Sequence, residues 1–259
     1  MISLTIADAV AEIVLDAPQK LNSLDEQALQ DLAQAYEDAA DAASRGEVRA
    51  LLLRGEGRAF CAGRDIAGVT PENDDAQAYL GGLVQPLLQK MSAFPAPTFA
   101  AAQGACLGVG LGLLLATDVV YVAENAKFGS PFAKLGATLD SGGHWYFTER
   151  LGMHRTLDLI YTAELMSGAE AVAQGLFSRA MPAEQLLETT RGIVARAAAG
   201  ATGAFNASKE LVAHIRDQRL GLWESMEEEN AEQARLCKSE DYAEGFRAFQ
   251  EKRSPVFKG

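Results

Sequence analysis

The stretch Gln103-Gly104-Ala105-Cys106-Leu107-Gly108-Val109-Gly110 decides the fold of this chain, together with Phe60-Cys61-Ala62-Gly63-Arg64-Asp65 earlier in the sequence. Each stretch carries glycines close to an apolar segment that is typical of a buried strand. Glycine tolerates backbone angles that leave N–H groups facing a ligand. Two such donors that converge on one point could hold a developing oxyanion.

The composition indicates a globular protein with one large core. The chain has 259 residues, of which 48% are hydrophobic and 22% are charged. Its formal net charge of -12 argues against nucleic acid as a partner, because a polyanionic backbone would be repelled. A phosphorylated ligand could still bind where a few cations are placed locally.

Three scattered cysteines, Cys61, Cys106 and Cys237, are too few for a disulfide framework and have no histidine at metal-ligand spacing. We therefore expect no metal site. The amino-terminal residues show no basic segment of a signal peptide, and the longest apolar stretch, 105–116, is too short to span a bilayer. The prediction is a cytoplasmic protein without a membrane partner.

Strand and helix patterns alternate up to about residue 130, after which the pattern is almost wholly helical. A capping box at Ser23-Leu24-Asp25-Glu26 predicts the start of the first helix. Strands are expected over 4–6, 10–15, 50–53, 98–103 and 119–122, and later helices over 76–93, 153–162, 167–174, 183–199, 204–235 (with a break near Leu220) and 239–252. The fold class is therefore α/β, with a helical carboxyl-terminal part.

Further short elements follow one another in an order that resembles the crotonase (enoyl-CoA hydratase/isomerase) superfamily over nearly the whole chain. The matching elements are 18–24, 60–66, 103–118, 128–131, 135–136, 142–143, 150–152 and 249–257. The resemblance implies a spiral of strand–strand–helix turns over 1–200. It also implies a helical region over 201–259 that packs on the core and on neighbouring subunits, in a homotrimer or a dimer of trimers.

The resemblance further implies an acyl-CoA thioester as substrate, with no cofactor apart from the coenzyme A that the substrate carries. The backbone N–H groups of Arg64 and Val109 would form the oxyanion hole, although the family usually has glycine at the second position. Lys20 and Lys252 would contact the phosphates of coenzyme A, and Asp65 would shape the adenine pocket. The full set of implied substrate contacts is Lys20, Leu21, Ala62, Asp65, Ile66, Gly108, Phe132, Trp145 and Lys252.

The chemistry is where this sequence departs from the family's hydratases. They carry two glutamates, and Gly112 and Phe132 stand at the matching positions here, where neither can exchange a proton. Asp140 instead occupies the position at which some isomerases of the superfamily carry a single acid/base. The sequence therefore favours an enoyl-CoA isomerase that moves a double bond by a 1,3-proton shift, in an apolar pocket where burial raises the pKa of Asp140.

Other interpretations stay open. Asp140 precedes Ser141-Gly142-Gly143, so it could simply close a turn. The same position serves ring-type isomerases of phenylacetate pathways, and dehalogenases in which an aspartate attacks as a nucleophile, but the histidine that dehalogenases need is absent from 64–69. A weak hydratase and a non-catalytic acyl-CoA-binding protein are the remaining alternatives.

Overall fold

A computed structural model describes residues 2–70 and 72–259 and confirms the α/β class. One sheet has the strand order β1-β2-β3-β4-β6-β9, in which β1 is antiparallel to β2 and every other pair is parallel. Its strands are β1 (Ile2–Ala7), β2 (Val10–Leu15), β3 (Ala50–Gly55), β4 (Thr98–Ala102), β6 (Val119–Ala123) and β9 (Arg179–Met181). The parallel strands in the middle are almost entirely apolar because helices cover both faces of the sheet.

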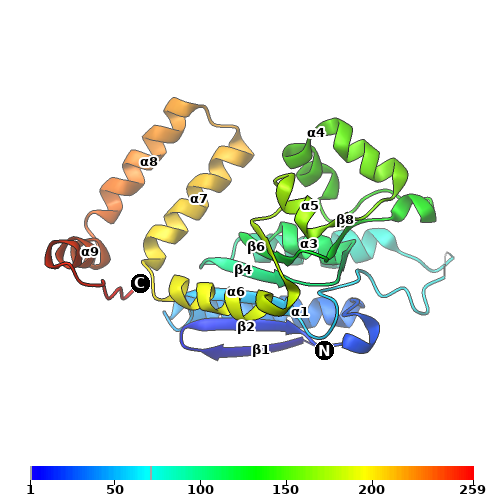
Figure 1. The fold of residues 1–259 in the computed structure, drawn as a ribbon, viewed down its shortest axis with the longest axis horizontal. Coiled ribbons are helices and arrows are strands. Elements are labelled where there is room, and N and C mark those ends of the chain that lie inside the picture. Colours follow the sequence, from blue (N-terminus) through cyan, green and yellow to red (C-terminus); the bar gives the residue numbers. More distant parts are fainter. Residues whose placement is uncertain (1, 71) are drawn as a thin grey trace.

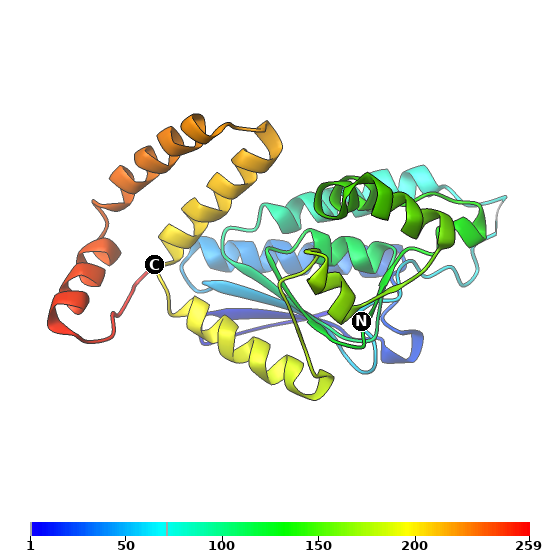
Figure 2. The ribbon, with the colours of Figure 1, turned by 45° about the horizontal axis from the view of Figure 1, so that its top comes forward.

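Helices α1 and α6 lie on opposite faces of this sheet (Figure 2). The helices of the first 200 residues are α1 (Glu26–Ser44), a π-helix η2 (Ala78–Val84), α2 (Gln85–Ser92), α3 (Val109–Leu115), α4 (Gly143–Thr162), α5 (Gly168–Ala173) and α6 (Ala183–Ala198). Short 3-10 helices cover Pro18–Lys20 (η1) and Phe132–Leu135 (η3). Most of the expected helices are thus confirmed to within a few residues.

One expectation about a helix start was wrong. The first helix is capped by Asp25, whose carboxylate accepts from the Ala28 N–H at 2.8 Å, and the box starting at Ser23 does not form. The helix expected from residue 153 is confirmed as the second half of α4, which follows a non-helical Gly152 with φ 75°, but α4 as a whole begins at Gly143. Paired glycines and aromatic residues conceal its first half, because they break the apolar periodicity that identifies a helix.

A second, three-stranded sheet was not expected as a separate unit. It consists of β5 (Ala105–Leu107), β7 (Lys127–Gly129) and β8 (Met166–Ser167), in that order. Strands this short show no clear alternation of apolar and polar residues, so the sequence does not predict them. An isolated bridge between Cys61 and Cys106 joins β5 to the loop that follows β3.

The last three helices extend away from the sheets in one direction (Figure 1). They are α7 (Thr202–Gln218), α8 (Leu222–Leu236) and α9 (Glu240–Glu251), and α7 and α8 pack side by side. The expected break near Leu220 is confirmed, since Arg219 adopts φ 56° and ends α7. Across 2–70 and 72–259, no helix has the length and apolar content that crossing a membrane would need.

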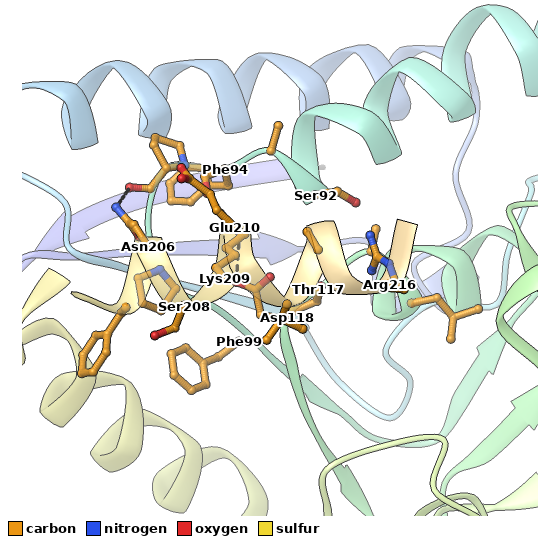
Figure 3. Close-up of a pocket in the computed structure, with 18 of the residues that line it drawn as sticks. Ser92, Phe94, Phe99, Thr117, Asp118, Asn206, Ser208, Lys209, Glu210 and Arg216 are labelled. Carbon is orange, nitrogen blue, oxygen red and sulfur yellow. Dashed lines mark hydrogen bonds and ion pairs between the residues drawn. The ribbon is translucent and has the colours of Figure 1, made fainter. Parts of the chain in front are cut away.

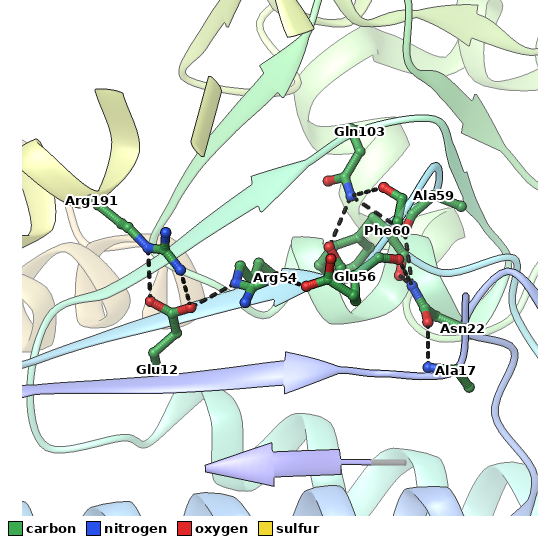
Figure 4. A network of polar contacts seen from close by, with 11 residues as sticks. Glu12, Ala17, Asn22, Arg54, Glu56, Ala59, Phe60, Gln103 and Arg191 are labelled. Atoms are coloured by element: carbon green, nitrogen blue, oxygen red, sulfur yellow. Dashed lines mark hydrogen bonds and ion pairs between the residues drawn. The ribbon is translucent and has the colours of Figure 1, made fainter. Parts of the chain in front are cut away.

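Polar contacts join the neighbouring strands β2 and β3 to helix α6 (Figure 4). The carboxylate of Glu12 on β2 accepts from Arg54 on β3 and from Arg191 on α6, both at 2.6 Å. Burial alone would raise the pKa of Glu12, but the hydrogen bonds from Arg191 and Arg54 lower it below its usual value. The ionised carboxylate therefore links α6 to the sheet at neutral pH.

Asn22 fixes the chain that leads into the first glycine-bearing loop (Figure 4). It is 1% exposed and has φ 57°, a left-handed conformation that asparagine tolerates. Its amide nitrogen donates to the carbonyl oxygens of Glu56, Ala59 and Phe60 at 2.8–3.1 Å. Its oxygen accepts from the Ala17 N–H at 2.8 Å. One side chain thus ties the segment after β2 to the segment after β3.

We predict that Asn22→Ala lowers the free energy of unfolding by about 3 kcal/mol, since it leaves several buried backbone groups without a partner. Urea denaturation measures this loss. Asn230→Ala, the same change at an exposed position on α8, should have almost no effect. Equal stabilities for the two variants would contradict the role assigned to Asn22.

Candidate active site

The first glycine-bearing loop leaves one backbone donor free. The Leu24 N–H donates to the Gly63 carbonyl at 2.8 Å, and the Asp65 N–H donates to the Leu24 carbonyl at 2.9 Å. Because alternate residues of an extended segment face opposite ways, the N–H of Arg64 points away from Leu24. In the described ranges this N–H makes no backbone hydrogen bond. It is available to a ligand, as an oxyanion-hole donor must be.

The second donor belongs to the start of α3. Val109 is the first residue of this helix, so its N–H has no acceptor within the helix. Gly108 before it has φ 51°, a conformation that few other residues adopt. The two loops touch, because a Cβ added to Gly63 would lie 2.8 Å from the carbonyl oxygen of Leu107. The structure therefore brings the Arg64 and Val109 segments together.

Asp140 lies between η3 and α4, with its side chain largely buried. Its carboxylate accepts from the Ser141 hydroxyl at 2.8 Å. Burial raises the pKa of Asp140, and the hydrogen bond from Ser141 and the charge of Arg64 oppose this rise only in part. The helix that follows is capped by Gly142, and the Asp140 side chain makes no capping contact among the described residues. A turn-closing role for this carboxylate is thus not what the structure shows.

Gly112 explains why Asp140 lies where it does. A Cβ added to Gly112 would overlap the Cβ of Ser141, so the loop that carries Asp140 packs directly on α3. A glutamate at position 112 would need the space that Ser141 fills. Phe132, at the other position of a hydratase glutamate, places its ring edge 2.9 Å from a Cβ added to Gly108. Position 112 thus packs against the loop of Asp140, and position 132 packs against the segment that leads into α3.

Five of the expected substrate contacts gather beside the first loop. Lys20 donates to Asp65 at 2.8 Å, and the Ala62 N–H donates to the carbonyl of Leu21 at 2.9 Å. Asp65 also accepts from the Ala67 N–H at 3.0 Å, as a residue that shapes a loop should. Ile66 is 63% exposed, so its side chain is accessible on the surface of the loop.

Two expected contacts lie elsewhere in the single chain. The Trp145 ring packs edge-on against Tyr146 and lies under the Arg216 guanidinium of α7, 5.4 Å from its carbon. The Trp145 ring thus contacts a neighbour on its own helix α4 and an arginine of α7. Lys252 follows α9, at the far end of the helical extension from α3 and α4 (Figure 1). This chain therefore does not bring Lys252 to its own candidate site.

A cavity of about 860 Å³ lies between α7 and the ends of α2 and α3 (Figure 3). At its centre Lys209 pairs with Asp118 at 3.0 Å and donates to the Phe94 carbonyl at 3.0 Å. Asp118 also accepts from the Thr98 N–H at 2.9 Å, so it ties the turn between α3 and β6 to the start of β4. Of the described residues that line this cavity, none is a candidate site residue, and we separate it from the acyl-CoA site.

The sequence did not identify two side chains that lie beside the first glycine-bearing loop, those of Tyr79 and Arg64. Tyr79 is 2% exposed and donates to the Leu24 carbonyl at 2.9 Å. The guanidinium of Arg64 lies over the Tyr79 ring, 4.2 Å from its centroid. Nothing in the sequence pattern pairs residues from a loop and a later helix, so only the fold reveals this contact.

No group of three or more potential metal ligands occurs in 2–70 and 72–259.

Comparison with known proteins gives the family of this chain. Residues 5–259 match the model of the enoyl-CoA hydratase/isomerase family. The chain is 35% identical over 258 residues to a Rhodobacter capsulatus protein named "Probable enoyl-CoA hydratase", covering 98% of this chain and 96% of that one. This chain belongs to the enoyl-CoA hydratase/isomerase family, in the crotonase superfamily.

Two further relatives bear on the chemistry. The Escherichia coli 1,2-epoxyphenylacetyl-CoA isomerase is 29% identical over 259 residues, which cover 98% of this chain and 97% of that protein. The crystal structure of an enoyl-CoA hydratase from Bacillus anthracis is similar with a TM-score of 0.90 and 29% identity, covering 100% of this chain and 99% of that one. Hydratases and an isomerase are thus both among the relatives.

Proposed function

We propose that this enzyme is an acyl-CoA isomerase that converts a 3-enoyl-CoA to a 2-enoyl-CoA, with Asp140 as its single acid/base. The carboxylate removes a proton from C2 of the thioester. The N–H groups of Arg64 and Val109 stabilise the charge that develops on the thioester oxygen. Asp140 then returns the proton to C4, so no water and no separate cofactor enter the reaction.

The placement of Asp140 carries this proposal. Among residues 112, 132 and 140, at which superfamily members carry their acid/base groups, Asp140 is the one that can exchange a proton. A carboxyl group with a raised pKa is a stronger base than an ordinary aspartate and a usable acid once protonated. One carboxylate suffices for a 1,3-proton shift, whereas adding water to a double bond normally needs two.

A ring-type acyl-CoA isomerase is the second candidate. The similarity to the Escherichia coli 1,2-epoxyphenylacetyl-CoA isomerase over nearly the whole chain favours it. A weak hydratase that uses Asp140 and water, and a non-catalytic acyl-CoA-binding protein, are the outcomes that the following experiment distinguishes from isomerisation.

We predict that the purified protein converts 3-hexenoyl-CoA to the conjugated 2-enoyl-CoA and adds no water to 2-hexenoyl-CoA. Absorbance of the conjugated thioester and product mass measure the two reactions. Asp140→Asn should lower kcat at least a thousandfold, since no other group can carry the proton, and should leave hexanoyl-CoA binding within about threefold. Unchanged turnover in this variant would rule out Asp140 as the acid/base, and binding without turnover of the unsubstituted protein would indicate a non-catalytic member.

The pH dependence of kcat/KM tests the same assignment. The base must be ionised, so activity should fall as pH falls through the pKa of Asp140, which burial holds above its usual 3.8. Ser141→Ala removes a hydrogen bond that favours the carboxylate, so the pKa rises and the acidic limb moves to higher pH. Ser44→Ala, at an exposed site on α1, should leave the profile unchanged.

We also propose that the enzyme is a homotrimer or a dimer of trimers. The helical extension exposes large apolar side chains that nothing in the described chain covers, and a solitary chain would leave them in water. Leu222 and Trp223 are 66% and 70% exposed, and Phe249 is 84% exposed. In such an oligomer, Lys252 of one subunit would lie nearer to the candidate site of a neighbouring subunit.

Light scattering should therefore give three or six times the mass of the chain. Replacing Trp223 and Phe249 by glutamate should lower this mass, because charged side chains cannot be buried in such an interface. Ile6→Glu is a matched control on β1, where the side chain is 42% exposed. A monomeric unsubstituted protein would contradict the proposal.

A further inference from the structure

Leu24 sets the direction of the Arg64 N–H, the first of the two proposed oxyanion donors. This N–H and the Gly63 carbonyl belong to the same planar trans peptide group, so they point in opposite directions. The Gly63 carbonyl accepts from the Leu24 N–H at 2.8 Å, which makes the Arg64 N–H face away from Leu24. On the other side of Arg64, the Asp65 N–H donates to the Leu24 carbonyl at 2.9 Å. Leu24 therefore fixes both peptide groups that flank the Arg64 Cα.

Tyr79 holds Leu24 in turn. The Tyr79 hydroxyl donates to the Leu24 carbonyl at 2.9 Å, so this carbonyl accepts from both Tyr79 and Asp65. The same side chain contacts the other residue of the Leu24–Arg64 bridge, because the Arg64 guanidinium lies over the Tyr79 ring, 4.2 Å from its centroid. One tyrosine thus contacts both residues of the bridge that directs the oxyanion donor.

Tyr79 is anchored, although the chain before it lies on the surface. Residues 66–70 and 72–78 are all exposed, and Tyr79, the first buried residue after them, is 2% exposed. The Tyr79 N–H donates to the Asp75 carbonyl at 3.0 Å. The Asp75 carboxylate accepts from the Ala78 N–H at 2.9 Å. The residues at the start of η2 therefore hold this side chain in a fixed position.

The Tyr79 hydroxyl keeps its proton and serves as a hydrogen-bond donor. Burial raises the pKa of Tyr79, and the charge of Arg64 offsets this rise only in part. A backbone carbonyl can only accept, so the bond to Leu24 uses the phenolic proton. A phenylalanine would fill the same space and keep a ring under Arg64, but it could not hold the Leu24 carbonyl. The two contacts of Tyr79 can therefore be tested separately.

We propose that Tyr79 is a positioning residue of the oxyanion hole, which acts through Leu24 to keep the Arg64 N–H directed at the thioester oxygen. The proposal rests on the oxyanion hole of the proposed function and adds to it a residue that does not touch the substrate. Hydrogen bonds weaken steeply as their angle departs from linearity, so a donor that turns away stabilises the developing charge less. Tyr79 therefore acts on the chemical step more than on substrate binding.

The carbonyl stretching frequency of a bound, unreactive thioester tests this without turnover. Hydrogen bonds from an oxyanion hole polarise the carbonyl and lower its frequency. Infrared spectra of hexanoyl-CoA, labelled with a heavy carbon isotope at the thioester carbonyl, should show a lower frequency when it is bound to the full-length protein than in buffer. Tyr79→Phe should lose part of this shift and keep the affinity for hexanoyl-CoA within about threefold, because the carbonyl contact contributes little to ground-state binding.

Turnover of 3-hexenoyl-CoA gives the second readout. Tyr79→Phe should lower kcat about tenfold and leave KM nearly unchanged, since a misdirected donor weakens the transition state more than the bound substrate. Tyr79→Leu, which also removes the ring under Arg64, should lower kcat and the carbonyl shift further. Tyr161→Phe makes the same change on α4, where the side chain is 74% exposed, and should alter neither quantity. A loss of stability alone would reduce the amount of active protein without moving the frequency of the bound carbonyl.

The outcomes separate this proposal from the proposed function. A Tyr79→Phe protein that keeps the full carbonyl shift would overturn the role of Tyr79 and leave the isomerase proposal intact. A carbonyl shift that Tyr79→Phe reduces, in a protein that does not turn over 3-hexenoyl-CoA, would support the role of Tyr79 and contradict the isomerase. Failure of hexanoyl-CoA to bind, or binding without any shift, would overturn the oxyanion hole and the role of Tyr79 with it.

Discussion

The candidate site depends on the close approach of two backbone segments. One is the loop after β3 at Gly63 and the other is the start of α3 at Gly110, and no side chain lies between them. A Cβ on Gly110 would lie 2.7 Å from the Cβ of Cys61, and one on Gly63 would lie 2.8 Å from the Leu107 carbonyl oxygen. Because the segments touch, the free N–H of Arg64 and the free N–H at the start of α3 become neighbours. The isolated β-bridge, which pairs the backbones of Cys61 and Cys106, keeps the two segments in register.

Close packing without a side chain also positions Asp140, the proposed acid/base. Gly112 has no side chain, so Ser141 rests on α3 and carries Asp140 into a largely buried position. Desolvation then raises the pKa of this carboxyl, while Ser141 and the charge of Arg64 limit the rise. In this chain the glycine at position 112 therefore does more than remove a catalytic group. It leaves the space in which the loop of Asp140 packs on α3.

The sequence predicted much of the fold because long apolar runs indicate buried strands and apolar residues at helical spacing indicate helices packed on a core. The strands β1, β2, β3, β4 and β6 of the large sheet and the helices α1, α5, α6 and α9 were expected within a few residues, whereas the three-residue edge strand β9 was not. The small sheet was not, since three-residue strands have no usable period. The first half of α4 was missed because Gly142, Gly143 and Gly152 interrupt its pattern. The capping box at Ser23 does not form because the helix begins two residues later than it requires, with Asp25 as the N-cap; aspartate and serine cap about equally well, so residue type alone does not choose between them.

For the site, the sequence by itself determined the chemistry that is possible: two glycine-bearing loops, Asp140 at a family acid/base position after them, and no carboxylate at positions 112 and 132. These follow from residue identity and from the conformations that glycine allows. Only the tertiary structure decided which groups meet. It turned Trp145 toward α7, carried Lys252 to the far end of the helical extension, and set the Arg64 guanidinium on Tyr79. Contacts between residues far apart in the chain depend on how the elements pack, and local sequence patterns do not encode that packing.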